Sequence, residues 1–308
     1  MRKAVIIGGQ GKVGSFLVPM LVKEGFEVVS VSRGNTSPNV QNDAWNGVQL
    51  VRLDRDKPGF EASVADLKAD IVIDMICFKT TDMVKLIDAL RDSVSHYLVC
   101  GSIWMHGRST AVPLLENECR TPPDEYGIEK SNMDFEISRQ FAKSGFPGTA
   151  VHPGHIVCPL DVPVNPQGFK SLRAFEILRD GEPLYLPNFG METLHHVSAQ
   201  DVAGVFLAAI RTGRPAFGEG YHAVSPRAVT LSGYAQEVAG WYGKEADLRY
   251  EPFDVWKDRV TSEDAGMTKE HIERSPSVSM EKARNELGFI PKRTTFAAVR
   301  ECIASFGL

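Results

Sequence analysis

Residues 4–14 read A-V-I-I-G-G-Q-G-K-V-G, and this stretch decides the fold. Its first four residues are apolar and mostly β-branched, which is typical of a buried strand. Apolar residues then recur at helical spacing over residues 13–24. A strand, a glycine-rich turn and a helix in this order predict the first unit of a dinucleotide-binding domain.

Three glycines of this turn, Gly8, Gly11 and Gly14, are spaced G-x-x-G-x-x-G. The first permits a tight turn, the second lets the backbone approach a pyrophosphate, and the third lets helix and strand pack closely. The start of the helix presents free N–H groups and a partial positive charge to the phosphates. We therefore expect the glycines, with Lys12 and Val13 between them, to bind the cofactor; the alternative is a plain structural turn.

The end of the second predicted strand indicates which dinucleotide binds. An NAD site usually has an acidic residue there, bonded to the ribose 2′-hydroxyl. Here the strand ends in Ser32 and Arg33. Arg33 can pair with a 2′-phosphate and Ser32 can hydrogen-bond it, so we expect NADP, with NAD as the alternative. Arg33 as a solvated loop residue is the other interpretation.

The first half of the chain alternates strands with helices. Beyond the opening unit, we predict strands over 27–31, 48–53, 70–76, 96–100 and 148–152, and helices over 81–92 and 126–143. Continuous apolar strands separated by helices indicate a parallel sheet covered on both faces. The fold class is therefore α/β, a Rossmann-type doubly wound sheet, with a smaller C-terminal substrate-binding lobe.

The second half is less regular. We predict helices over 169–179, 198–212, 231–242, 280–287 and 296–306, and short strands over 184–186 and 220–224. Ser198 is expected to cap its helix, and Gly288 to end the helix before it. The dinucleotide-binding domain is expected to comprise residues 1–157 and about 193–224, and the lobe about 158–192 and 225–308. The charged segment 252–276 predicts no element.

Composition excludes several classes of protein. The 308 residues carry a net charge of −5, which argues against a nucleic-acid-binding surface. Five cysteines without a C-x-x-C pair or zinc spacing indicate reduced thiols in a cytoplasmic protein with no metal site. The opening apolar run stops at Gly8, too soon for an export signal, and no stretch reaches the roughly 18 apolar residues of a membrane span.

Tyr126 and Lys130 are four residues apart on a predicted helix, where their side chains share one face. A phenol with an ordinary pKa of about 10 is a poor base, and a nearby ammonium lowers that pKa. Ser102 follows the fifth strand, at the sheet edge where doubly wound folds bind ligands. We predict that Tyr126 exchanges a proton with the substrate, that Lys130 lowers the pKa of Tyr126, and that Ser102 holds the reacting oxygen.

These features together resemble the extended short-chain dehydrogenase/reductases, the NAD(P)-dependent epimerase/dehydratase group. The resemblance covers nearly the whole chain. Its motifs lie at residues 8–14, L-D-R at 53–55, C-G-S-I-W-M-H-G at 100–107, Y-G-I-E-K at 126–130, H-P-G-H-I-V-C-P at 152–159, H-H-V-S-A-Q-D-V-A at 195–203 and K-A-R-N-E-L-G-F-I-P at 282–291.

The resemblance implies roles for individual residues. It makes Ser102, Tyr126 and Lys130 the catalytic set, and it implies that Tyr126 and Lys130 also contact the cofactor, with Lys130 orienting the nicotinamide ribose. It adds further cofactor contacts at Asp54, Met75, Pro153 and Gly154. It implies that the substrate is contacted by Ser102, Trp104, His155 and His196. It also implies a homodimer through the helices over 81–92 and from Tyr126 onward.

Departures from the family pattern suggest an atypical branch. Ser32 and Arg33 replace the acid of NAD-using members, His152 replaces an arginine, and Trp104 replaces a small hydroxyl residue. The implied activity is tyrosine-assisted hydride transfer at a hydroxyl or carbonyl of a sugar or nucleotide sugar. Two alternatives remain open: an NADPH-dependent reductase of a non-sugar carbonyl compound, and a non-catalytic NADP-binding sensor or RNA-associated scaffold.

Overall fold

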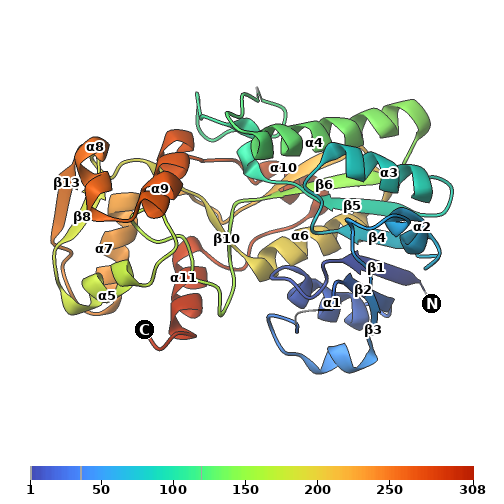
Figure 1. The fold of residues 1–308 in the computed structure, drawn as a ribbon, viewed down its shortest axis with the longest axis horizontal. Coiled ribbons are helices and arrows are strands. Elements are labelled where there is room, and N and C mark those ends of the chain that lie inside the picture. The colour runs from blue at the N-terminus through green and yellow to red at the C-terminus, as the bar shows by residue number, and fades with distance from the viewer. Residues whose placement is uncertain (1, 35–36, 119) are drawn as a thin grey trace.

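The central sheet has seven parallel strands in the order β11-β6-β5-β4-β1-β2-β3. A computed structural model describes residues 2–34, 37–118 and 120–308 (Figure 1). The strands are β1 (Lys3–Ile7), β2 (Glu27–Ser32), β3 (Gln49–Arg52), β4 (Ile71–Asp74), β5 (His96–Cys100), β6 (Gly148–Pro153) and β11 (Glu219–Ala223). The order reverses beside β1, where Ile7 lies between Val31 of β2 and Asp74 of β4. This switch point is where doubly wound sheets bind ligands.

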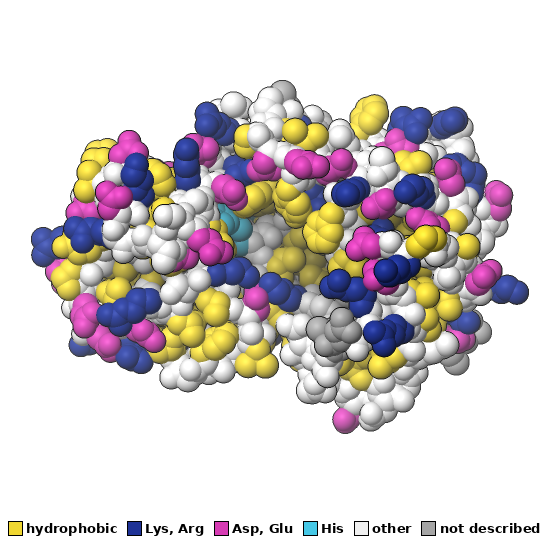
Figure 2. All heavy atoms as spheres, in the orientation of Figure 1, with side chains coloured by type: hydrophobic (Ala, Val, Ile, Leu, Met, Phe, Trp, Pro, Cys, Tyr) yellow, Lys and Arg dark blue, Asp and Glu magenta, His cyan; other side chains and the backbone are white. Residues whose placement is uncertain are grey.

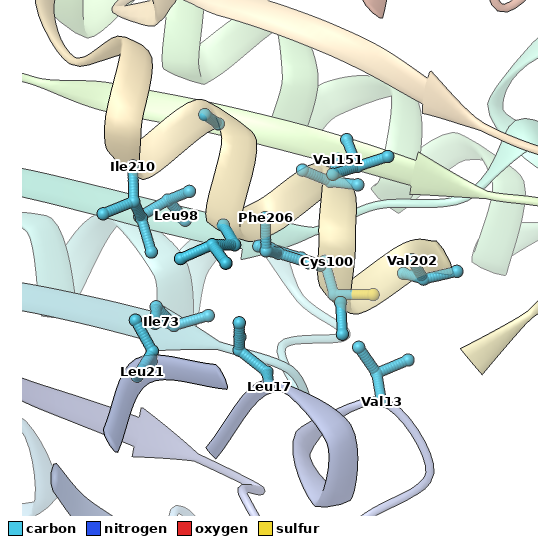
Figure 3. Packing of buried hydrophobic residues seen from close by; sticks show 14 of the residues in the cluster. Val13, Leu17, Leu21, Ile73, Leu98, Cys100, Val151, Val202, Phe206 and Ile210 are labelled. Carbon is cyan, nitrogen blue, oxygen red and sulfur yellow. The ribbon is translucent and has the colours of Figure 1, made fainter. Parts of the chain in front are cut away.

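Helices cover both faces of the sheet, as the continuous apolar strands require. Ala4 and Ile6 point into a core with α1 (Gly14–Lys23), α6 (Ala199–Thr212) and α10 (Glu281–Leu287). Figure 3 shows side chains of α1 and α6 meeting those of the sheet in this core. Val5 and Ile7 point into a second core with α2 (Phe60–Ala65), α3 (Thr80–Leu90) and α4 (Glu125–Ser144).

A smaller lobe lies at the other end of the molecule from β3 (Figure 1). Its elements are α5 (Arg173–Asp180), β8 (Leu184–Pro187), α7 (Leu231–Trp241), β13 (Leu248–Glu251), α8 (Phe253–Trp256), α9 (Ser262–Arg274) and α11 (Thr295–Ala304). Phe175, Tyr234 and Val299 belong to its own apolar core. The domain boundaries expected from the sequence remain a prediction.

Two short strand pairs lie outside the main sheet. β7 (His155–Val157) pairs in parallel with β10 (His196–Ser198), so that His155 lies opposite His196. β9 (Thr193–Leu194) pairs antiparallel with β12 (Val229–Thr230). The first pair continues directly from β6, and it therefore carries the chain from the main sheet towards the lobe.

The predicted α/β fold is confirmed, with local differences. Ser198 caps α6 by accepting the N–H of Asp201 at 3.0 Å, and Gly288 ends α10 with φ +64°. The helix predicted from residue 169 begins only at Arg173, because Phe169 closes a turn in which its carbonyl accepts the N–H of Asn165 at 2.9 Å. The unassigned segment 252–276 contains α8 and α9. None of the described helices is long and apolar enough to cross a membrane.

Candidate active site

The glycine turn has the geometry that its spacing predicts. Gly8 has φ +83°, and its N–H donates to Val31 O at 2.8 Å. Gly11 donates to Gly8 O at 3.0 Å. A Cβ on Gly14 would lie 2.6 Å from the carbonyl carbon of Gly9 and overlap its oxygen, so only glycine fits. Among the described residues no acceptor meets the N–H of Lys12 or Val13, which begin the helix and can receive an anion.

A cavity of about 380 Å³ opens beside this turn, within the range of small-molecule sites. It lies at the carboxyl ends of β1, β2 and β3 and is lined by Ile7, Gly8, Gln10, Gly11, Val31, Ser32, Arg33, Leu53, Asp54, Arg55, Asp56, Phe60, Ile76 and Phe78. Apolar walls and a polar rim at the glycine turn fit the adenosine half of a dinucleotide.

Ser32 and Arg33, the two residues expected to select NADP, differ in whether their polar groups are already hydrogen-bonded within the protein. Ser32 Oγ donates to Gln10 Oε1 at 2.5 Å and accepts the N–H of Gly34, so its hydroxyl is already engaged. Arg33 lines the cavity with an exposed side chain. Asp54 also lines the cavity.

Other predicted cofactor residues lie next to the turn rather than on the cavity wall. Lys12 Nζ forms an ion pair with Asp161 at 2.7 Å. Val13 packs its side chain in the core, and Met75 donates its N–H to Ile7 O. Beyond β6, Pro153 is buried, and a Cβ on Gly154 would overlap His195 O.

Some lining residues carried no signal in the sequence. Ile76 and Phe78 follow β4, and both line the cavity. Arg55 also lines the cavity, and its guanidinium lies 2.5 Å from Asp74 and over the Phe60 ring. Their position just past strand ends was the one available indication.

Tyr126 and Ser102 come together at the carboxyl edge of the sheet. α4 begins at Asp124, whose Oδ1 accepts the N–H of Gly127 at 2.7 Å, and this places Tyr126 in the first turn. Ser102 Oγ accepts the N–H of Trp104 at 3.2 Å and caps a short 3₁₀ helix over Ile103–His106. Burial raises the pKa of Tyr126, and a hydrogen bond with Ser102 opposes that rise in pKa.

Lys130 is buried beside Tyr126 and has two backbone acceptors. Its Nζ donates to Cys77 O at 2.6 Å and to Cys100 O at 2.7 Å, and lies 5.6 Å from the centre of the Tyr126 ring. Burial raises the pKa of Tyr126 in this structure, and the expected lowering of that pKa by the ammonium stays a prediction. Through its two hydrogen bonds Lys130 also ties the segment after β4 to the end of β5.

A wall of aromatic side chains continues from Tyr126 towards the lobe. The Trp104 ring lies 5.9 Å from that of Tyr126 and 5.4 Å from that of His271, edge to face. His271 lies 4.7 Å from His155, which lies 5.5 Å from His196. The structure thus brings together the predicted substrate residues Trp104, His155 and His196. Figure 2 shows a hollow between the two parts of the molecule, with a histidine on its wall.

Two residues of this wall, His271 and Arg274, come from α9 and were missed. The Arg274 guanidinium stacks 3.9 Å above the Trp104 ring and forms an ion pair with Asp124. Both residues are buried although the segment reads as charged. The signal that could have found the helix is T-S-E-D at residues 261–264, where Thr261 caps α9 by accepting the N–H of Asp264 at 3.1 Å.

The imidazoles of this wall are neutral at neutral pH. His196 Nε2 bonds to Val164 O at 3.0 Å, and burial lowers the pKa of His196 to about 4. Burial and the neighbouring imidazoles lower the pKa of His155 well below its usual value. Within the described residues, no group of three His, Cys, Asp or Glu side chains could hold a metal ion.

His152, at a position where the family pattern has arginine, packs against Gly101, next to Ser102. Its Nε2 lies 2.7 Å from Asp134 Oδ1, and Asp134 also pairs with Arg120 at 2.7 Å. The His152 ring occupies the space where a Cβ on Gly101 would lie. Cys77, Cys100, Cys158 and Cys302 are free and buried, and Cys119 lies outside the described residues.

The doubly wound sheet, the glycine turn at its switch point and the Ser102–Tyr126–Lys130 set define a dinucleotide-binding protein of the extended short-chain dehydrogenase/reductase type. Residues 4–221 match the model of the NAD dependent epimerase/dehydratase family. The chain belongs to this family.

Individual relatives differ in what their names state. The chain is 25% identical over 306 residues to chloroplast stem-loop binding protein of 41 kDa b from Arabidopsis thaliana, covering 94% of this chain and 75% of the relative. It is 32% identical over 141 residues to 2′-dehydrokanamycin reductase from Streptomyces kanamyceticus, covering 46% of this chain and 39% of the relative. A solved UDP-glucose 4-epimerase from Thermotoga maritima superposes with a TM-score of 0.74 at 16% identity, over 99% of this chain and 98% of the epimerase. That last likeness shows the fold alone.

Proposed function

We propose that this protein is an NADP-linked enzyme of the epimerase/dehydratase type that transfers a hydride at a hydroxyl or carbonyl of a sugar or nucleotide sugar. The observation that carries the proposal is that Tyr126, in the first turn of α4, and Ser102, just after β5, lie at the same carboxyl edge of the sheet as the glycine turn. A substrate oxygen bound between them could receive a proton from Tyr126 and a hydrogen bond from Ser102.

The chain's own residues suit the handling of one proton. A bound dinucleotide supplies the hydride chemistry at its nicotinamide. Tyr126 holds its proton at neutral pH, since burial raises its pKa, and it is ready to give that proton to a carbonyl oxygen. Ser102 orients the same oxygen. Lys130 holds this edge of the sheet in place by donating to Cys77 O and Cys100 O. An ammonium has three N–H groups, so two bonds leave one for another acceptor.

NADP is our choice of cofactor because Arg33 lines the cavity at the end of β2, where NAD sites have an acid. An exposed guanidinium at this point can pair with a 2′-phosphate. NAD remains the alternative within an NAD-dependent family.

One partial relative is named as a reductase, and this favours a second candidate, a net NADPH-dependent reductase of a carbonyl compound. A non-catalytic RNA-associated role is less well supported, because the net charge is −5.

We also propose that the protein acts in the cytoplasm.

The test compares Tyr126→Phe with the parent enzyme, using UDP-glucose and unphosphorylated keto sugars as substrates. We expect turnover to fall about 10²–10⁴-fold with NADPH affinity unchanged, because only the proton is removed. Tyr250→Phe, altered on β13 of the lobe, is the matched control. Full activity in Tyr126→Phe contradicts the proposal. Stoichiometric loss of NADPH indicates a reductase, and tightly retained cofactor without net change indicates an epimerase.

The homodimer expected from the resemblance also remains a proposal. Ile128 and Phe135 of α4 are 46% and 66% exposed, which supports a partner on this helix. Sedimentation of the parent and of Phe135→Glu tests it, since a charge on the shared face should yield monomers.

A further inference from the structure

α9 reaches the start of α4 through a single buried side chain. Arg274, the last residue of α9, is 2% exposed. It forms an ion pair with Asp124 Oδ2, while Asp124 Oδ1 caps α4 by accepting the N–H of Gly127. One carboxylate therefore serves both the cap that begins the helix of Tyr126 and the contact with the lobe.

The same guanidinium also fixes the aromatic neighbour of Tyr126. It stacks 3.9 Å above the Trp104 ring, a geometry in which a cation is attracted to the ring face. Trp104 in turn meets the Tyr126 ring edge-on at 5.9 Å. Arg274 thus contacts both groups that hold the phenol in place, the helix cap and the ring beside it.

The chemistry of arginine matters at this position. A planar guanidinium can pair with a carboxylate through its edge and stack on an indole through its face at the same time, and an ammonium cannot do both. Arg274 Nη1 also donates to Glu270 O at 2.7 Å, which anchors the side chain to its own helix. The buried side chain therefore has three contacts, with the Asp124 carboxylate, the Trp104 ring and Glu270 O.

We propose that Arg274 is a positioning residue, which transmits the docking of α9 to Tyr126 through Asp124 and Trp104. This inference rests on the proposed function of Tyr126. A substrate that seats the lobe would align the phenol with its oxygen, and a chain with a misplaced α9 would bind the dinucleotide but turn over slowly. Errors of about 1 Å in such alignment cost on the order of 10²-fold in rate.

The test uses Arg274→Met, which keeps a stem of similar length and removes the planar cation. Tyr126 is observed directly in the cofactor-free protein, by the ¹³Cζ resonance of labelled tyrosine, assigned with Tyr126→Phe. We expect the resonance to shift and its pKa to fall towards the ordinary value, because a loosened phenol meets more water. We expect kcat to fall about 10–100-fold with NADPH affinity unchanged, and Arg274→Lys to restore part of it.

Two further variants keep the result interpretable. Arg108→Met removes another arginine that pairs with α9, through Glu273 at 3.5 Å, but its side chain is 66% exposed, and it should change neither readout. Asp124→Asn retains a good helix cap and loses the charge partner, so it should reproduce part of the effect even where Arg274→Met fails to fold.

The outcomes separate this inference from the proposed function. A folded Arg274→Met, or Asp124→Asn in its place, with the parent's Tyr126 resonance and titration overturns the positioning role, whatever its activity. A shifted resonance in Arg274→Met, together with full activity in Tyr126→Phe, supports the positioning role and refutes the function proposed for Tyr126.

Discussion

The dinucleotide cradle and the substrate wall of this protein are built in opposite ways. The cradle comes from four short stretches, 7–11, 31–33, 53–60 and 76–78, that each follow a strand of one sheet. The wall comes from Trp104, Tyr126, His155, His196 and the α9 pair His271 and Arg274. Parallel strand ends meet at one edge by topology alone, whereas the wall exists only where the lobe docks.

Lys130 offers the largest test of this contrast, since it supports the edge that both regions share. Replacement by Met leaves two buried carbonyls, Cys77 O and Cys100 O, without their donor. We expect a loss of about 2–6 kcal/mol in the free energy of unfolding, measured by urea denaturation, at about 1–3 kcal/mol per unsatisfied group. Lys143→Met, in the last turn of the same helix, should lose almost nothing. Equal stability of the two variants would show that Lys130 serves catalysis alone.

The cradle itself is tested by Gly14→Ala. The added methyl meets the backbone of Gly9, and overpacking of this kind costs about 1–3 kcal/mol of stability. NADPH binding, measured by calorimetry, should be lost with it. Gly47→Ala is the matched control, because nothing lies within 4 Å of its Cβ. An unchanged affinity in Gly14→Ala would break the assignment of this turn to the phosphates.

Two buried histidines, His96 at the start of β5 and His196 in the wall, compare how far the sheet core and the wall exclude water. Burial lowers the pKa of His96 in the sheet and of His196 in the wall from 6.5 to about 4. Between these values the unfolded chain binds a proton that the folded chain does not, so stability falls as pH drops from 6.5 towards 4. Each site contributes up to about 1.4 kcal/mol per pH unit.

The measurement is the slope of unfolding free energy against pH for His96→Gln and His196→Gln. In each variant the unfolding free energy should depend less steeply on pH than in the parent, by the contribution of one titrating histidine. If the slope falls in His96→Gln but not in His196→Gln, water reaches the wall. The cradle and the wall would then differ in solvation as well as in how far apart their residues lie in the chain.

The smallest expected effect belongs to Arg33. An exposed charge contact is worth about 1 kcal/mol, so Arg33→Ala should weaken NADPH binding about fivefold and leave NADH binding unchanged. Arg249→Ala, exposed on β13 of the lobe, should change neither affinity. If both coenzymes respond alike in Arg33→Ala, Arg33 is not the selector.

What could be predicted follows the same division. The strands, the cap at Ser198 and the spacing of Gly8, Gly11 and Gly14 depend on neighbours in the chain, and the structure bears them out. The acceptors of Lys130 could not be predicted, because helical spacing fixes which residues are neighbours but not where a long side chain finds its hydrogen-bond partners. Those acceptors, Cys77 O and Cys100 O, lie 53 and 30 residues away.

The burial of the polar face of α9 could not be predicted for a related reason. Its face towards the wall carries His271 and Arg274, whose polar atoms are buried by groups elsewhere in the chain. A polar residue gives no hydrophobic signal of burial, and its partners at Asp124, Trp104 and His155 are known only once the lobe is in place.

The place of α9 near the end of the chain also bears on how such proteins diversify. One helix supplies two of the side chains that shape the cleft, yet it contributes to no strand of the seven-stranded sheet. If the wall contacts the substrate as proposed, we expect exchange of residues 262–274 between homologues to change the compound accepted and to leave the coenzyme unchanged.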